Sequence, residues 1–573
     1  MDAQIKQKID QWLTGNFDEE TKAQLQQQLD SNPDEVADAF YKNLEFGTGG
    51  LRGIMGVGTN RMNKYTVGMA TQGYSNYLKQ IFGNDVSVAI AHDSRNNSRA
   101  FAEITANVFA ANDIKVYLFE SLRPTPELSF AIRHLGCQGG VVCTASHNPK
   151  EYNGYKAYWN DGAQMVPPHD VNVIAEVEKI QSVDDVKWTG GENNIISIGK
   201  EMDDAYIAMV KGLSIYPEAI QAQKDLKIVY TPLHGTGITL VPKVLSELGF
   251  INVSIVEEQQ EPNGDFPSVE YPNPEERETM SIGLKKADEL DADILLGTDP
   301  DADRVGVGVK DNHGKWILLN GNQTALLAFN YVIEARKEKG LATPDDMVVK
   351  TIVTTYMIDE IAKANNVKCY NVLTGFKWIS SLIREKEGKE KYIIGGEESF
   401  GLMIGDQIRD KDAVSAVAMI CEMAAVEKNN GRTLFDKLIS LYVQYGFYKE
   451  ALVSITKKGM NGAAEIAQMM AEDRANPPRE IGKQKVAFLL DYETGKETNL
   501  ADDTSTPINL PKSNVLQFVL EDGSRISARP SGTEPKIKYY FSVKAPLQSA
   551  ANFDEVSAQL DEKLKLLAKE MGV

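Results

Sequence analysis

The chain has 573 residues, too many for one hydrophobic core, and this length suggests roughly three to five domains. Its 42% hydrophobic and 25% charged residues are typical of an ordinary globular protein. Lys and Arg number 61 against 81 Asp and Glu, a formal net charge of -20 that argues against nucleic acid or an anionic membrane as a partner.

The four cysteines are too few and wrongly spaced for a disulfide framework or a metal site. We expect Cys137, Cys143, Cys369 and Cys421 to be reduced. The N-terminal residues lack the apolar run of a signal peptide, and no stretch has the length of a transmembrane helix. These features predict a cytoplasmic protein.

Residues 2–43 are polar and helix-favouring, and they predict an appended helical arm anchored by Trp12, Leu13, Leu25 and Leu29. From Phe46 onwards, short apolar strands alternate with amphipathic helices. Strands are predicted at 86–91, 115–119, 139–143, 226–230 and 294–297, and helices at 98–111, 239–249, 277–290 and 323–340. Strands separated by helices predict βαβ units with mixed or mostly parallel sheets.

The last section of the chain has a different pattern. Strands are predicted at 451–455, 486–490, 515–520 and 536–543, followed by an amphipathic helix over 554–571. We place the domains at 1–205, 206–325, 326–450 and 451–573. The predicted fold class is α/β, with three similar α/β domains that contain mixed sheets and a C-terminal α+β domain.

Ser146 lies in the segment 144–149, directly after the predicted strand 139–143. A hydroxyl at the carboxyl end of such a strand projects into the crevice where open α/β sheets bind ligands. The G-x-S-x-G elbow of hydrolases is excluded, because Thr144 and Asn148 stand at the glycine positions. The alternative is a serine that merely caps a turn.

Three aspartates at alternate positions, Asp299, Asp301 and Asp303, follow another apolar run. Such carboxylates can converge on one hard cation, and their mutual repulsion is unfavourable without it. An EF-hand loop does not fit, because Arg304 stands where that loop needs Gly and Lys310 where it needs Glu. The alternative is a solvated acidic turn, but the apolar flanks favour a Mg²⁺ site.

Two further segments contain groups suited to a phosphorylated sugar. In 395–401, Glu397 and Ser399 offer hydroxyl-binding groups beside adjacent glycines. In 529–535, Arg529, two hydroxyls and a Gly-rich backbone suit a phosphate dianion. Each segment alone is equally compatible with an ordinary turn.

Two cations complete the set of candidates. Arg52, in the Gly-rich segment 46–53, is expected on a flexible loop. Lys156 lies ten residues beyond Ser146 and is expected to share its pocket. Neighbouring cations would lower the pKa of such a lysine and let it carry protons, although most lysines are only solvated charges.

Together, four motifs resemble the α-D-phosphohexomutase superfamily: TASHNP at 144–149, DPDADR at 299–304, GEESFG at 396–401 and RPSGTEP at 529–535. The resemblance spans about residues 44 to 545. The strings TPLHGTG (231–237), LTGFKWI (373–379) and RDKDAV (409–414) look like the long bacterial phosphoglucomutase/phosphomannomutase type. The resemblance implies four domains around a central cleft, each supplying one loop.

The resemblance also implies residue roles. Ser146 would be the phosphorylated serine, and an oxygen of its phosphate would hold Mg²⁺ together with Asp299, Asp301 and Asp303. Proton transfer would involve Arg52, His147 or Lys156, and some relatives carry a His where this chain has Gly401. The substrate would be bound by Arg304, Lys377, Glu397 and Ser399, and its non-reacting phosphate by Arg529, Ser531, Gly532 and Thr533.

The implied enzyme is an isomerase that interconverts glucose 1-phosphate and glucose 6-phosphate by intramolecular phosphoryl transfer. Its cofactors would be Mg²⁺ and glucose 1,6-bisphosphate, the latter as intermediate and activator. It would act on small hexose phosphates as a monomer or small homo-oligomer. The alternatives are a phosphomannomutase, a phosphopentomutase, a glucose-1,6-bisphosphate synthase, a metal-dependent phosphatase and a non-catalytic phosphosugar-binding protein.

Overall fold

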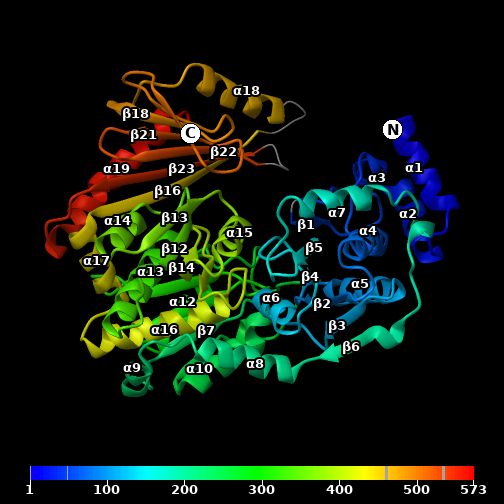
Figure 1. Ribbon diagram of the computed structural model, residues 1–573, viewed down its shortest axis with the longest axis horizontal. Helices are drawn as coiled ribbons and strands as arrows, with labels where there is room; N and C mark the ends of the chain where they lie inside the picture. The colour runs from blue at the N-terminus through cyan, green and yellow to red at the C-terminus, as the bar shows by residue number, and fades with distance from the viewer. Residues whose placement is uncertain (1, 48, 458–461, 532–535) are drawn as a thin grey trace. The chain divides into compact units, whose positions relative to one another are not determined.

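The computed structural model describes residues 2–47, 49–457, 462–531 and 536–573 (Figure 1). The chain divides into two compact units. Unit 1 contains residues 1–321, 376–395 and 399–431, and unit 2 contains residues 322–375, 396–398 and 432–573. Unit 1 therefore includes segments from the region that the sequence assigns to the third domain.

The predicted N-terminal arm forms three helices, α1 (Ala3–Thr14), α2 (Glu19–Ser31) and α3 (Pro33–Phe40). Each begins after an Asp or Asn whose side chain accepts a backbone N–H of the first turn. Trp12 stacks on Phe17 at 4.3 Å and meets Phe40 and Tyr65 edge to face at 5.4 and 5.5 Å. Tyr65 belongs to α4 (Lys64–Phe82), so aromatic packing attaches the arm to the body of unit 1.

The first sheet of unit 1 has the strand order β1-β5-β4-β2-β3-β6. The pairs β2–β3, β2–β4 and β3–β6 are parallel, whereas β4–β5 and β1–β5 are antiparallel, so the sheet is mixed as predicted. The strands are β1 (Gly50–Ile54), β2 (Ser87–His92), β3 (Lys115–Phe119), β4 (Gly139–Cys143), β5 (Tyr152–Trp159) and β6 (Ile195–Ile198). The helices of this region are α4, α5 (Ser98–Ala111), α6 (Thr125–His134), α7 (His169–Glu178) and α8 (Lys200–Lys211).

Two glycines explain how helices approach β4 from both sides. A Cβ at Gly139 would lie 2.1 Å from the Tyr74 hydroxyl of α4, and a Cβ at Gly140 would lie 2.6 Å from Ile132 of α6. Successive residues of a strand point to opposite faces, so both faces of β4 are covered by helices. The segment that carries Ser146 therefore leaves an interior, fully buried strand.

The expectation that Arg52 lies on a flexible loop is wrong. Arg52 is the third residue of β1, where it is paired with Gly154 of β5. Antiparallel pairing with β5 supplies hydrogen bonds to this Gly-rich segment that its local composition does not indicate. The pairing aligns Arg52 with the strand that carries Lys156.

The second sheet of unit 1 has the order β11-β10-β9-β7-β8 and is also mixed. Its strands are β7 (Ile228–Thr231), β8 (Val253–Ile255), β9 (Ile294–Thr298), β10 (Val305–Lys310) and β11 (Trp316–Leu319). Its helices are α9 (Pro217–Ala222), α10 (Val241–Leu248), α11 (Glu257–Gln260) and α12 (Ser281–Glu289). The helix predicted over 277–290 begins late, because the Asn273 side chain and carbonyl accept N–H groups from Glu275 and Glu276 and hold the chain in turns.

The region after β11 contributes to both units. Unit 1 contains α15 (Phe376–Lys386), the neighbouring strands β14 (Lys391–Gly396) and β15 (Leu402–Ile404), and α16 (Ala413–Asn429). The last residue of β14, Gly396, is assigned to unit 2. Unit 2 contains the parallel pair β12 (Asp346–Thr351) and β13 (Lys368–Val372). Its helices here are α13 (Gly321–Glu338), whose first residue belongs to unit 1, α14 (Met357–Ala364) and α17 (Leu434–Tyr445).

The C-terminal part of unit 2 is an antiparallel sheet with the order β16-β23-β22-β21-β18-β19-β20, and β17 pairs with β18. Helix α19 (Phe553–Glu570) lies along β16 and β23 (Figure 1). The strands are β16 (Phe447–Thr456), β17 (Glu480–Ile481), β18 (Gln484–Asp491), β19 (Lys496–Asn499), β20 (Ser505–Pro507), β21 (Leu516–Leu520), β22 (Arg525–Pro530) and β23 (Lys536–Ala545), with α18 (Gly462–Ala475) after β16. The predicted α+β character of this section is confirmed.

Two general expectations can be compared with the structure. Cys137, Cys143, Cys369 and Cys421 are all free thiols. Within the part of the chain that the structure describes, no helix combines the length and the apolar character needed to cross a membrane.

The stability of unit 2 should depend on the protonation of Glu450 in β16. Burial raises the pKa of its carboxyl from 4.5 to about 7. The stabilising contribution of the bound proton is therefore fully present below pH 4.5 and is lost as the pH rises through about 7, by roughly 3 kcal/mol at most. We expect Glu450→Gln to raise the urea midpoint at about pH 8.5 and to leave it nearly unchanged at about pH 5.

The matched control is Glu521→Gln, which changes an exposed glutamate that follows β21 in the same sheet. Its urea midpoint should follow that of the wild type at both pH values. Equal pH dependence in the wild type and Glu450→Gln would contradict the assignment.

Candidate active site

Ser146 lies three residues beyond β4 and is 3% exposed. Its φ of 53° is in the left-handed region, which is uncommon for a residue other than glycine. The Ser146 hydroxyl donates to Asp299 Oδ2 at 2.6 Å, and His147 Nδ1 lies 3.2 Å from the same hydroxyl. Two motifs that are 153 positions apart in the sequence thus meet at this serine.

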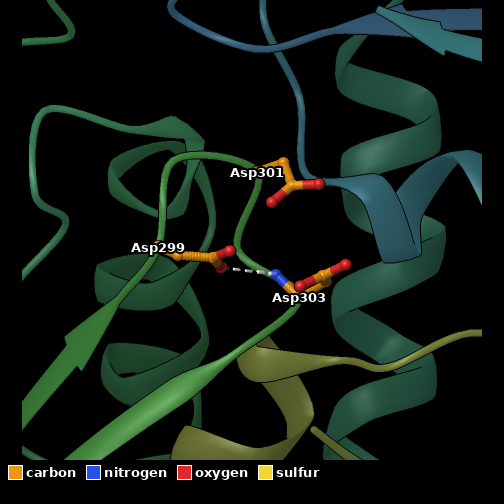
Figure 2. A group of neighbouring side chains, drawn as sticks. All are labelled: Asp299, Asp301 and Asp303. Carbon is orange, nitrogen blue, oxygen red and sulfur yellow. Dashed lines mark hydrogen bonds between the residues drawn. The ribbon is translucent and has the colours of Figure 1, made fainter. Parts of the chain in front are cut away.

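The loop between β9 and β10 carries the three aspartates (Figure 2). Asp299, Asp301 and Asp303 are at most 1% exposed, and one carboxylate oxygen of each lies within 4.8 Å of the others. Asp299 Oδ1 accepts the backbone N–H of Asp303 at 3.1 Å, drawn in Figure 2, and that of Arg304 at 3.0 Å. The loop therefore closes on its own first carboxylate.

Three successive carbonyl oxygens of this loop accept backbone N–H groups from the first residues of three helical segments, η3 (Thr236–Thr239), α6 and α16. Helix N-termini carry partial positive charge and unsatisfied donors. They therefore both hold the loop backbone and favour negative charge beside it. The bonds join Thr236 to Pro300 at 2.8 Å, Thr125 to Asp301 at 2.9 Å and Ala413 to Ala302 at 3.2 Å.

Two buried lysines lie against the carboxylates. Lys156 Nζ, from β5, is 2.6 Å from Asp301 Oδ2 and 3.4 Å from Asp303 Oδ2, and Lys411 Nζ is 3.1 Å from Asp303 Oδ2. Burial alone would lower the pKa of Lys156, but Asp301 and Asp303 raise it above its ordinary value. The condition under which the sequence allowed Lys156 to carry protons, a pKa lowered by neighbouring cations, is not found here, because the nearest charged groups are the anions Asp301 and Asp303.

The carboxylates themselves are unequally affected. Burial and the charges of Asp301 and Asp303 raise the pKa of Asp299 well above its ordinary value. For Asp301, burial is outweighed by Lys156, and its pKa is lowered. The pKa of Asp303 is lowered as well, because burial and Asp301 are outweighed by Lys411, Lys156 and Arg304, so Asp299 differs from the other two in the direction of its shift.

The donor set of this group fits a divalent cation. Among the described side chains, Asp301 Oδ1 and Asp303 Oδ1 are buried oxygens that accept no hydrogen bond. Buried carboxylate oxygens without donors are unfavourable unless a cation binds them, and hard divalent cations prefer such ligands. The three aspartates could hold a metal ion, as the sequence predicted.

Other predicted residues surround Ser146 in unit 1. Arg304 Nη1 donates to Glu275 Oε1 at 2.7 Å. Burial, followed by the positive charges of Arg304 and Arg52, lowers the pKa of His147 well below its ordinary value. Unit 1 therefore brings together the serine, the histidine, the three aspartates and the predicted cations Arg52, Lys156 and Arg304.

The region after β11 contains the three remaining sugar-binding candidates, Lys377, Glu397 and Ser399. Lys377 of α15 is 3.9 Å from Asp170 of α7, and burial lowers its pKa. Ser399 is partly buried in unit 1, between β14 and β15. In unit 2, Glu397 Oε1 accepts the backbone N–H of Gly375 at 2.9 Å.

The predicted phosphate segment follows β22 in unit 2. Arg529 near the end of β22 hydrogen-bonds Tyr540 of β23, whose pKa is raised by burial and then by Glu398. The Ser531 N–H donates to the Lys536 carbonyl at 2.7 Å. The charges of Arg529 and of the sugar-binding candidate Glu397 thus both affect the pKa of Tyr540. Gly532 and Thr533 lie outside the described residues.

Sequence reasoning missed Lys411. Its segment, RDKDAV, indicated only a subgroup of the family, because nothing local links it to Asp303. The adjacent Asp410 accepts the Tyr158 hydroxyl at 2.6 Å and pairs with Lys411 at 3.1 Å, which fixes the lysine beside the aspartates. The signal available in the sequence was a pair of acidic residues around a lysine, directly before a buried helix.

Comparisons with known proteins give a consistent result. The chain matches the four family models described as phosphoglucomutase/phosphomannomutase alpha/beta/alpha domains I, II and III and C-terminal domain, over residues 43–184, 204–314, 320–444 and 465–559. A phosphoglucomutase of Staphylococcus epidermidis is 38% identical over 93% of this chain and 95% of its own length. A phosphoglucomutase of Staphylococcus aureus is 37% identical over 96% of this chain and 97% of its own length.

A crystal structure of parafusin, a phosphoglucomutase from Paramecium in an open form, has a similar fold. It has a TM-score of 0.66 and 20% sequence identity, and the match covers 92% of this chain and 96% of that chain. At this identity the similarity supports the fold alone.

Divalent cations should stabilise the chain through the three aspartates. The reason is that a cation offsets the mutual repulsion of buried carboxylates and binds oxygens that otherwise accept no hydrogen bond. We expect a millimolar divalent cation to raise the melting temperature of the wild type by a few degrees and to leave Asp301→Asn/Asp303→Asn unshifted. Asp291→Asn, which changes an exposed aspartate before β9, is the matched control and should respond like the wild type. An equal shift in all three proteins would show that the cation binds elsewhere.

Proposed function

The chain belongs to the phosphoglucomutase/phosphomannomutase family, and we propose that it interconverts glucose 1-phosphate and glucose 6-phosphate through a phosphoserine at Ser146. The observation that carries the proposal is the 2.6 Å contact between the Ser146 hydroxyl and Asp299, within a buried group of three aspartates. The relatives named phosphoglucomutase share 37% to 38% identity over almost the whole chain, which favours glucose over mannose phosphates. The enzyme is accordingly an isomerase of the intramolecular phosphotransferase type.

In this proposal the metal is Mg²⁺, held by Asp299, Asp301, Asp303 and an oxygen of the phosphorylated Ser146. When bound there, Mg²⁺ would supply positive charge to the transferring phosphoryl group, which is the main requirement of phosphoryl transfer. Lys156 and Lys411 keep Asp301 and Asp303 ionised for this role. Arg304 and Arg52 add positive charge near the serine.

Phosphoryl transfer takes place in two steps. The phosphoserine gives its phosphoryl group to the free hydroxyl of the bound hexose phosphate, and the proton of that hydroxyl passes through a base to the Ser146 oxygen as the O–P bond to the serine breaks. The resulting bisphosphate turns over, and the Ser146 oxygen takes the other phosphoryl group while its proton passes back through the base to the sugar oxygen that is released. A trace of glucose 1,6-bisphosphate acts as activator because it phosphorylates a dephosphorylated Ser146.

His147 is the side chain best suited to accept that proton. Its Nδ1 lies 3.2 Å from the Ser146 hydroxyl, which is within reach of a proton that moves to or from that oxygen. Lys156 Nζ lies 2.6 Å from Asp301 and 3.4 Å from Asp303, and in this proposal its role is to bind negative charge. This assignment accounts for catalysis in a chain that has Gly401 at the position where some relatives have histidine.

We assign substrate binding to the remaining candidates. Arg304, Lys377, Glu397 and Ser399 bind the sugar, and Arg529, Ser531, Gly532 and Thr533 bind its non-reacting phosphate. The domain bounds 1–205, 206–325, 326–450 and 451–573 then divide the chain into parts for the serine, the metal, the sugar and the phosphate. We further propose a cytoplasmic enzyme, a monomer or small homo-oligomer, whose partners are hexose phosphates rather than nucleic acid or membranes.

The test is conversion of glucose 1-phosphate to glucose 6-phosphate with Mg²⁺ and a trace of glucose 1,6-bisphosphate, beside mannose and ribose 1-phosphates. We expect the glucose substrate to be converted fastest, no conversion in EDTA, and loss of all mutase activity in Ser146→Ala with an unchanged melting temperature. Faster conversion of mannose or ribose phosphate would keep the mechanism and change the substrate. A Ser146→Ala variant that still turns over would refute the phosphoserine.

Arg529→Ala should weaken substrate binding. Hydrogen bonds to charged groups contribute about 1.5–3 kcal/mol, so kcat/KM should fall roughly 10- to 150-fold, mainly through KM. Arg525→Ala in the same strand changes an arginine that packs on Tyr356 at 3.8 Å and serves as the matched control. Unchanged kcat/KM in Arg529→Ala would reject its role in phosphate binding.

A further inference from the structure

The backbone of Ser146 is held from both sides by side chains that the proposed mechanism does not use. Its N–H donates to Thr144 Oγ1 at 2.8 Å, and its carbonyl oxygen accepts a hydrogen bond from Arg95 Nη2 at 2.5 Å. A serine with φ in the left-handed region is unfavourable by about 1 kcal/mol or more, and it persists only where the surroundings determine it. These two hydrogen bonds hold the Ser146 backbone in this conformation.

Asp93 controls both of the supporting side chains. Its Oδ2 accepts the Thr144 hydroxyl at 2.6 Å and lies 3.4 Å from Arg95 Nε. Its Oδ1 accepts the backbone N–H of Arg95 at 2.9 Å and the hydroxyl of Ser98 at 2.6 Å. The side chains of Asp93 and Arg95 are both 0% exposed, so a completely buried ion pair stands directly behind the serine.

Arg95 also holds the rest of the serine segment. Its Nη1 donates to the carbonyls of Pro149 at 2.8 Å and Tyr152 at 3.2 Å, and its Nη2 donates to the carbonyl of Asn148 as well as to that of Ser146. Only a guanidinium presents enough donors in one plane to bind several carbonyls at once. A single side chain therefore fixes the course of the backbone from Ser146 to the start of β5.

The same guanidinium connects the serine segment to the second sheet region. Its central carbon lies 5.0 Å from the centroid of the Phe266 ring, in the segment between α11 and α12. A Cβ at Gly264 would lie 2.3 Å from the Asn96 backbone nitrogen, so this segment packs directly on the residue that follows Arg95. Arg95 and its neighbour Asn96 thus fix the position of Ser146 relative to the region that supplies the aspartate loop.

We propose that Asp93, Arg95 and Thr144 are positioning residues that keep the Ser146 oxygen aligned with Asp299 while the phosphoryl group leaves and returns. A buried ion pair is costly to desolvate and is weak evidence for stability, so its value here lies in the geometry that it imposes. The inference rests on the proposed function, because it assigns these residues to the phosphoryl transfer at Ser146. None of them touches the substrate in this assignment.

Thr144 offers a matched pair of variants that separates positioning from packing. Thr144→Ser keeps the hydroxyl and removes a methyl group, whereas Thr144→Val keeps the volume and removes the hydroxyl. A displacement of about 1 Å costs on the order of 100-fold in rate, so we expect Thr144→Val to lower kcat about 100-fold with KM within about threefold of the wild type. Thr144→Ser should keep kcat within about fivefold of the wild type.

The opposite order, with Thr144→Ser the more impaired variant, would show that Thr144 acts by packing and would overturn the inference. Equal kcat values for the two variants would do the same. Arg95→Lys is the second test, since lysine retains the charge but cannot bind several carbonyls in one plane, and we expect its kcat to fall at least about 10-fold at unchanged KM. Retention of the wild-type kcat by Arg95→Lys would show that Arg95 is not a positioning residue.

The activity of the wild type distinguishes a failure of the proposed function from a failure of the positioning role. A wild type without mutase activity on any of the three sugar phosphates would refute the proposed function, and the positioning role with it. An active wild type whose Thr144 variants do not differ would refute the positioning role alone. Melting temperatures identify any variant that has lost the fold. If Thr144→Val is one of these, the kcat of Arg95→Lys tests the positioning role in its place.

Discussion

The burial of three aspartates in one loop is the constraint on which the rest of the site depends. Asp299, Asp301 and Asp303 repel one another in a region from which water is excluded. Compensation comes from Lys156 and Lys411 and from the N-termini of three helical segments that bind the loop carbonyls. Since these groups belong to segments far apart in the chain, only the tertiary structure of unit 1 brings them to the loop.

A second buried charge system, Asp93 with Arg95, lies behind the serine segment, and the two systems meet at Ser146. The aspartate loop receives the Ser146 hydroxyl, while the ion pair holds the Ser146 backbone. One system therefore provides charge for the chemistry and the other provides geometry. This division explains why the serine can adopt an unfavourable backbone conformation, since both of its peptide groups are bound before any substrate arrives.

The sequence was informative where the signal is local. The strand before Ser146 and the run before Asp299 are continuous apolar segments followed by polar residues, and both end as predicted at the site. The pairing of β1 with β5 was not predictable, because antiparallel addition at a sheet edge leaves no mark on either segment, and Arg52 was therefore assigned to a loop. Long-range contacts likewise decided the direction of the Lys156 pKa shift and the role of Lys411, neither of which local composition contains.

The same long-range charges decide how protons can move. Asp301 and Asp303 raise the pKa of Lys156, whereas burial and the cations Arg304 and Arg52 lower the pKa of His147. A raised pKa makes a lysine less ready to release its proton, whereas a lowered pKa favours the neutral form of an imidazole, which is the form that can accept a proton. The cations that lower the pKa of His147 destabilise its protonated form, so in the proposed mechanism His147 passes the proton on to the Ser146 oxygen instead of retaining it. The proposed acid–base role in a chain with Gly401 therefore rests on the groups around Ser146 rather than on the motif itself.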